Sequence, residues 1–259
     1  KFFTGFKAAF NPSFALGSAV HEQILQPHLF KLAEDTHKPT AKMGGMADEL
    51  YDIYCQREIT DEDIINASDK VDYYKGKMTA DRIAEVRSKC SQYWETRSNY
   101  ELNLDENRDI RYLDYPMLEK AKSCIESLQS NKLVMDLLHP KGLIEDPISE
   151  CEQAILLDVK ATMPDGKEVI LHLKAKLDNY TIDTESNVIK VNDVKTHGQM
   201  LNTFDISKVK YHYNREIAFY MYLLSLIAKK NYGLDNPKKQ ANYLVVSTVP
   251  NFYSTVVPV

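Results

Sequence analysis

The chain has 259 residues, of which 44% are hydrophobic and 27% charged, and its formal net charge is −5. This composition is ordinary for a folded soluble protein, and the acidic balance does not by itself suggest nucleic-acid binding. The longest apolar stretch, residues 217–228, is too short to cross a bilayer. We therefore expect no membrane partner and a cytoplasmic location. Because the chain begins at Lys1, we also expect a fragment of a longer protein.

The four cysteines lie far apart in the sequence and form no C-x-x-C pair. None has a histidine nearby at the spacing of a zinc site. We interpret them as reduced thiols that act as small core hydrophobes. They are Cys55, Cys90, Cys124 and Cys151.

The N-terminal part of the chain, residues 1–46, predicts one helix followed by a loop. A proline and a serine favour a helix start at residue 12, and Pro27 suggests its end near residue 25. Gly17 and His21 are four residues apart and therefore share a face of this helix. We expect residues 35–46 to form an exposed loop.

The middle of the chain, residues 47–146, predicts an acidic helical region. Thr60, with Asp63 three residues later, is typical of a capping box at a helix start. We expect residues 96–113, which are polar, to be irregular. The other predicted helices of this region cover residues 47–56, 79–95 and 114–137.

From residue 147 to residue 259 the pattern changes to a period of two, which indicates strands. Pro164-Asp165-Gly166 is typical of a turn that joins two strands into a hairpin. The order predicts a mixed α/β (α+β) fold in which helices flank a central sheet. The strands are expected at residues 153–163, 167–178, 187–195, 242–249 and 253–257, with a long helix at 208–230.

Two acidic residues and a lysine stand out in the strands. Asp178 ends one strand, and the next strand carries Asp193-Val194-Lys195. Residues two apart in a strand point to the same face, so Asp193 and Lys195 project together, and pairing can bring Asp178 beside them. Two carboxylates and an ammonium group suit Mg²⁺ or Mn²⁺ and a polarised water. The alternative is an ordinary cross-strand ion pair facing solvent.

A third carboxylate is expected from the start of the hairpin. Glu152 opens the first strand and can reach the same site. Glu145 and Glu150 are nearby competitors, and the sequence leaves the choice among the three open.

Four segments in order give the chain a resemblance to a known family. They are GSAVHEQILQP (17–27), KAKLD (174–178), VNDVKT (191–196) and YHYNREIAFY (211–220). Together they resemble the PD-(D/E)XK nuclease superfamily, and within it the RecE (exonuclease VIII) and lambda-exonuclease branch. The resemblance implies one nuclease domain over residues 1–259, with a restriction-endonuclease-like catalytic core in residues 147–259.

The resemblance also implies roles for individual residues. His21, Asp178 and Asp193 match metal ligands that hold one or two Mg²⁺ or Mn²⁺ ions, Lys195 matches the catalytic lysine, and Glu152 matches a further acid of the catalytic set. The family usually has Gln where this chain has Glu216. Members with an iron–sulfur cluster bind it through clustered cysteines, so the dispersed cysteines predict no such cluster.

The activity that the resemblance implies is metal-dependent 5′→3′ exonuclease digestion of double-stranded DNA ends, in phage-type recombination and DNA repair in a bacterial or phage-infected cytoplasm. It also implies a ring-shaped homo-oligomer and a single-strand annealing protein as partner. The alternatives are an endonuclease or structure-specific nuclease of the same fold, or a non-catalytic binding module. Candidate DNA contacts, each of which could equally be an ordinary surface or core residue, are Lys174, Lys176, Lys208, Lys210, Arg215, Tyr213 and Glu216.

Overall fold

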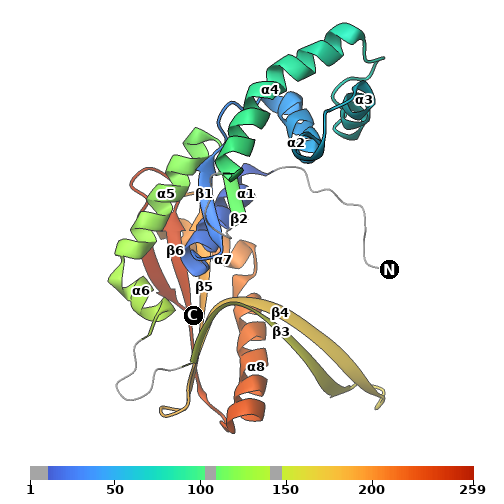
Figure 1. The fold of residues 1–259 in the computed structure, drawn as a ribbon. Coiled ribbons are helices and arrows are strands. Elements are labelled where there is room, and N and C mark those ends of the chain that lie inside the picture. The colour runs from blue at the N-terminus through green and yellow to red at the C-terminus, as the bar shows by residue number, and fades with distance from the viewer. Residues whose placement is uncertain (1–10, 103–108, 141–147) are drawn as a thin grey trace. The chain divides into compact units, whose positions relative to one another are not determined.

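The computed structural model describes residues 11–102, 109–140 and 148–259 (Figure 1). The chain divides into two compact units. The first, called the sheet unit here, contains residues Lys1–Lys31 and Glu119–Val259, and the second, the helical unit, contains Leu32–Leu118. Within the described ranges, no helix combines the length and the hydropathy that a membrane crossing requires.

The sheet unit is built on a five-stranded mixed sheet with the order β3-β4-β5-β6-β7. β5 and β6 run parallel, and every other neighbouring pair is antiparallel. This arrangement confirms the predicted mixed α/β fold. The strands are β3 (Ile148–Thr162), β4 (Glu168–Asp183), β5 (Val188–His197), β6 (Lys238–Ser247) and β7 (Ser254–Pro258).

Helices pack on both faces of this sheet (Figure 1). On one face, the amide of Asn192 in β5 donates to the Leu137 carbonyl at the end of α6, 3.1 Å away. On the other face, α8 buries an apolar stripe that includes Ile217 and Leu224. The helices of the unit are α1 (Pro12–Leu25), α5 (Tyr115–Ser130, in this unit from Glu119 onward), α6 (Lys132–Leu138), α7 (Phe204–Lys210) and α8 (Tyr213–Tyr232), with a 3₁₀ turn η1 (Leu201–Thr203).

The β3–β4 hairpin extends as a long curved arm beyond the other strands (Figure 1). Its register pairs Ile148 with Ile182 at the base and Thr162 with Glu168 near the tip. The predicted turn closes it: the Met163 amide donates to the Lys167 carbonyl, 2.9 Å away, and Gly166 has a φ of 81°, which favours glycine.

The helical unit packs three helices around its own core. The strands β1 (Phe30–Glu34) and β2 (Asp109–Leu113) form a separate two-stranded sheet. The capping box predicted at Thr60 is confirmed, since its side chain accepts from the Asp63 amide and the Asp63 side chain accepts from the Thr60 amide. Buried side chains from α2 (Ala41–Gln56), α3 (Asp61–Lys70) and α4 (Ala80–Leu102) include Leu50, Ile64, Val86 and Trp94.

Four local predictions were wrong. The helix predicted at 114–137 is two helices, α5 and α6, which are separated at Asn131. Residues 41–46 lie in α2 rather than in a loop, because Met43 and Met46 pack into the core of the helical unit. Of the residues 96–113 that the structure describes, 96–102 lie in α4 and 109–113 form β2, rather than irregular chain. The long helix predicted at 208–230 is two helices, α7 and α8, which are separated at His212, where φ is 56°.

Candidate active site

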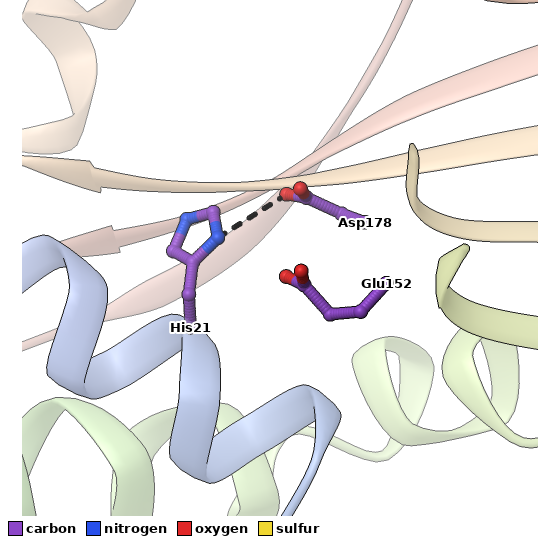
Figure 2. Close-up of side chains that lie close together, drawn as sticks. All are labelled: His21, Glu152 and Asp178. Carbon is purple, nitrogen blue, oxygen red and sulfur yellow. Dashed lines mark ion pairs between the residues drawn. The ribbon is translucent and has the colours of Figure 1, made fainter. Parts of the chain in front are cut away.

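Three side chains from distant parts of the sequence converge in the sheet unit. His21 projects from α1, Glu152 from β3 and Asp178 from β4, and all three point toward one another (Figure 2). One ligand atom from each lies within 4.8 Å of the others. The Nδ1 atom of His21 is 3.4 Å from Oδ2 of Asp178.

Close approach of α1 to the sheet brings His21 to this point. The helix begins at a capped N-terminus, where the Asn11 side chain accepts a hydrogen bond from the Ser13 amide. One turn before His21, Gly17 lies so near β5 that a Cβ atom in its place would be 3.2 Å from Oγ1 of Thr196. A glycine at this position therefore allows the helix backbone to approach the strand.

Glu152 occupies an unusual position in β3. The pairs Cys151–Asn179 and Gln153–Leu177 on either side place it opposite Asp178, yet its own φ is 56°. A non-glycine residue in the left-handed region is strained, and such strain concentrates at functional sites. This backbone conformation directs the carboxylate of Glu152 toward Asp178 and His21 (Figure 2). Glu152 also forms an ion pair with Lys176.

Two of the three candidate acids are described, and the structure separates them. The carboxylate of Glu150 accepts a hydrogen bond from the Tyr180 hydroxyl, 2.8 Å away, and is not part of the converging group. Glu152 is part of it. Glu145 lies outside the described residues.

β5 supplies the predicted Asp193–Lys195 pair. The Nζ atom of Lys195 is 2.8 Å from Oδ2 of Asp193 and donates to Oδ1, 3.1 Å away. The side chain of Asp178 binds to the backbone of this strand, because Oδ2 of Asp178 accepts a hydrogen bond from the Val194 amide, 2.8 Å away. The side chain of Asp193 is only 3% exposed. The site therefore contains a buried ion pair next to a partly buried group of possible metal ligands.

The surroundings shift the protonation of both aspartates. Burial raises the pKa of Asp178 to about 7, against the opposing attraction of Lys195. Burial and the neighbouring Asp178 carboxylate raise the pKa of Asp193 to about 7. A raised carboxyl pKa means that the folded protein holds these negative charges at a cost.

The two basic groups respond in opposite ways. Burial disfavours the charged ammonium of Lys195, but the carboxylates of Asp193 and Glu216 outweigh that effect and raise its pKa. Burial and the nearby ammonium of Lys195 lower the pKa of His21. Lys195 thus remains charged at neutral pH, and His21 is held in the neutral form that can bind a metal.

The residues present fit a divalent metal ion. Two carboxylates and a neutral imidazole offer donor atoms of the type that such ions accept. The whole group contains the four carboxylates of Glu152, Asp178, Asp193 and Glu216 against the two ammonium groups of Lys176 and Lys195. The buried Oδ2 of Asp193 lies 2.8 Å from Nζ of Lys195 but accepts no well-aligned hydrogen bond from the described residues. A bound dication would compensate this excess of negative charge.

The N-terminal part of α8 closes the site on the side of Lys195. Oε2 of Glu216 is 3.3 Å from Nζ of Lys195, and Oε1 accepts a hydrogen bond from the Tyr220 hydroxyl at 2.8 Å. The ring centroid of Tyr213 lies 4.9 Å from the same ammonium. Tyr213 also packs against the core of the sheet unit, so it has a packing role as well.

The basic residues predicted to contact DNA are dispersed. Lys176 pairs with Glu152, and Lys208 pairs with Asp205 at 2.8 Å. Nζ of Lys210 lies 5.2 Å from the ring centroid of Tyr211. Two exposed residues, Lys174 and Arg215, form no ion pair within the described part of the chain.

A row of asparagines, which the sequence pattern did not reveal, crosses the sheet. The side-chain amide of Asn192 donates to Asn179 at 2.8 Å, and that of Asn242 donates to Asn192 at 2.9 Å. Asn179 directly follows Asp178, and Asn192 directly precedes Asp193. Both asparagines are fully buried, and because neighbouring residues of a strand alternate, they point to the face of the sheet opposite the aspartates. This row holds β4, β5 and β6 in register and so fixes how the two aspartates face each other. In the sequence, the sign of this row was that an asparagine stands directly beside each of the two site aspartates.

Comparison with known proteins adds little to this geometry. No protein-family model matches the chain, and no curated protein matches it. The chain is similar to a crystal structure described as "Putative exonuclease" from Eubacterium rectale, with a TM-score of 0.37 and 11% sequence identity. That match covers 98% of this chain and 79% of the other.

Proposed function

We propose that the chain is a metal-dependent nuclease that hydrolyses phosphodiester bonds at the ends of double-stranded DNA. The observation that carries the proposal is the convergence of His21, Glu152 and Asp178 beside the buried Asp193–Lys195 pair. The order of the sequence motifs, which resembles the RecE-like branch of the PD-(D/E)XK nucleases, supports the choice of DNA ends and of the 5′→3′ direction.

Each residue of the site has a distinct part in this proposal. His21, Glu152 and Asp178 would hold Mg²⁺ or Mn²⁺, with Asp193 as a further ligand. A divalent cation supplies Lewis-acid polarisation of a phosphoryl oxygen and lowers the pKa of a bound water.

Lys195 is expected to orient the attacking water or to stabilise negative charge that develops on phosphorus. Asp193 and Glu216 keep it charged, since both carboxylates raise its pKa. The left-handed backbone at Glu152 and the glycine at position 17 are positioning features, because they aim the ligands without touching substrate.

The test is digestion of end-labelled linear duplex DNA in the presence of Mg²⁺, Mn²⁺ or EDTA, beside a covalently closed circle. A Lys195→Ala variant, checked for folding by circular dichroism, serves as the control for contaminating nucleases. We expect metal-dependent loss of label from linear DNA only, with loss first from the 5′ end, and no loss with the variant.

Other results would redirect the proposal. Nicking of the closed circle would indicate an endonuclease of the same fold. Loss of label in EDTA, or equal activity of the Lys195→Ala protein, would contradict the assignment of this site. A folded protein that cleaves none of these substrates under any metal condition would favour a non-catalytic binding module.

A further inference from the structure

The outer edge of β3 is a long strand edge without a partner strand among the described residues. β3 pairs only with β4 and lies at one end of the sheet order. It runs for 15 residues without a proline, and its irregular residue, Glu152, lies near the base of the hairpin, before the segment 156–162 on the arm. Exposed edges of this kind template pairing with another strand unless charges, prolines or bulges prevent it. On the arm, Leu156 is 71% exposed, which leaves apolar surface beside this edge.

A groove runs along the same edge. Its volume is about 660 Å³. Five consecutive β3 residues, 156–160, line one wall, and Leu226, Lys229 and Lys230 of α8 line the other. Consecutive residues of a strand point to alternate faces, so a groove that touches all five follows the backbone edge rather than one face. This space suits an extended strand laid alongside β3.

The hydrogen-bond pattern of the hairpin shows which backbone groups face the groove. Because the Met163 amide bonds to the Lys167 carbonyl, residues 163, 161, 159 and 157 exchange hydrogen bonds with β4 in alternation. The intervening residues, among them Asp158 and Lys160, therefore direct their amides and carbonyls outward. An added antiparallel strand must pair through these groups.

The charges in this segment favour one self-pairing register, the one that sets Asp158 opposite Lys160. In a two-fold arrangement centred on Val159, Asp158 lies directly opposite Lys160 of a second copy, and Lys160 lies opposite the second Asp158. Both residues direct their backbone groups outward, so this register also satisfies the hydrogen bonds. A shift of the centre to Asp158 or to Lys160 would place like charges opposite each other, which is unfavourable.

The two side chains are exposed and can reach a partner across the edge, although Asp158 also contacts His172. Lys160 is exposed and forms no ion pair with any residue that the structure describes. Asp158 is 69% exposed, and its Oδ1 is 2.6 Å from Nδ1 of His172 on the neighbouring strand. On the other face, the two-fold would set Val159 against its own copy and Leu157 against Ala161, which continues the apolar face of the arm.

We propose that β3 pairs antiparallel with β3 of a second copy of this chain, centred on Val159, to form a dimer. Such a contact uses the same surface on both copies and closes with two. It therefore differs from the ring-shaped assembly that the family resemblance implies, and it does not depend on the proposed nuclease activity.

The experiment is sedimentation equilibrium of the whole chain over a range of concentrations, with charge-reversal variants. Lys160→Asp and Asp158→Lys each create two pairs of like charges across the two-fold. We expect each to raise the dimer dissociation constant on the order of tenfold or more. The double variant, Asp158→Lys with Lys160→Asp, restores opposite charges, and its dissociation constant should return to within about threefold of the wild-type value.

A matched control keeps the result interpretable. Lys167→Asp makes the same charge change at the exposed tip of the hairpin, outside the pairing strand, and should leave the dimer unchanged. Thermal unfolding of every variant checks the fold.

A wild-type protein that stays monomeric at all concentrations would overturn the proposal. So would a dimer that ignores the single reversals, or folded single variants that the double variant does not rescue. A monomer that instead binds a single-stranded oligonucleotide through Lys160 would assign the groove to nucleic acid.

Discussion

Each unit of this protein contains a partly buried cluster of charged residues, and the two clusters differ in the direction in which the pKa values of their carboxylates are shifted. In the helical unit, the guanidinium of Arg97 lies 3.0 Å from Oε1 of Glu101. The hydroxyls of Tyr51 and Tyr112 donate to the same carboxylate at 2.7 and 3.0 Å, and Arg97 stacks over both rings. Burial disfavours the charge of Glu101, but these hydrogen bonds outweigh it and lower its pKa.

The cluster in the sheet unit has the opposite character. Its carboxylates outnumber its ammonium groups, and both aspartates have raised pKa values. A carboxylate with a lowered pKa stabilises the folded state, whereas one with a raised pKa costs stability, and such costs are typical of functional sites. The contrast fits a structural cluster around Glu101 and the catalytic site that we propose in the sheet unit.

The largest expected effect comes from Asp178→Asn. Removing this carboxylate should weaken Mg²⁺ binding about 100-fold, because the site loses a charged ligand. In EDTA at pH 8 the same variant should be more stable than wild type by on the order of 1 kcal/mol, since the charge of Asp178 is held at a cost. Calorimetric titration and urea unfolding measure the two effects. Reduced stability with unchanged metal affinity would contradict the assignment.

The stability gain has a definite pH window. The raised pKa means that the folded state binds the proton of Asp178 more tightly than the unfolded state does. Wild-type stability therefore falls as pH rises from about 4 toward 7, and the variant escapes this loss. The difference between the two proteins should disappear near pH 4.

Substitution in the cluster around Glu101 in the helical unit should lower stability rather than raise it. Arg97→Met leaves Glu101 without its cation and should destabilise the helical unit by about 1–3 kcal/mol, discounted for the partial exposure of the pair. Lys89→Met, which breaks an exposed ion pair with Glu85 on the same helix, is the matched control and should destabilise the unit far less. If urea unfolding gave equal losses of stability for the two variants, burial of the Arg97–Glu101 pair would contribute nothing to the stability of the helical unit.

Metal affinity should depend on pH. Because the pKa values of Asp178 and Asp193 are both raised to about 7, protons compete with the metal below that pH. The dissociation constant for Mg²⁺ should rise by up to about tenfold per pH unit below 7 for each proton displaced. Titration calorimetry in buffers of different ionisation enthalpy counts those protons. A dissociation constant that stays constant between pH 5 and pH 8 would exclude both aspartates as ligands.

The smallest effect is expected from Glu216→Gln. The change removes a negative charge that faces the site, while Lys195 keeps its contact with Asp193 and the Tyr220 hydroxyl keeps an acceptor. We expect KM for DNA to fall about two- to fivefold, with kcat within about twofold of the wild-type value. A loss of kcat greater than about tenfold would instead make Glu216 part of the catalytic machinery.

The sequence by itself determined several local elements and the pairing of functional groups within one element. Helix α1, the capping box at Thr60 and the hairpin turn at Gly166 follow from short-range rules of capping and turn conformation. The shared face of Asp193 and Lys195 follows from the period of a strand, and the shared face of Gly17 and His21 from that of a helix. Each depends on neighbours within a few residues, so no tertiary information is needed.

Only the tertiary structure decided how these pieces meet. Glu152 and Glu150 have the same residue type and similar positions, and only the left-handed backbone at Glu152 and the pairing of Glu150 with Tyr180 separate their roles. The local sequence of residues 41–46 predicts a loop, and only the packing of Met43 and Met46 into the core of the helical unit makes this segment helical. The raised pKa values of the aspartates likewise arise from burial, which is a property of the packed chain. Long-range packing contributes free energy that no local pattern encodes. Here that packing places Glu152, rather than Glu150, beside Asp178 and raises the pKa values of both aspartates.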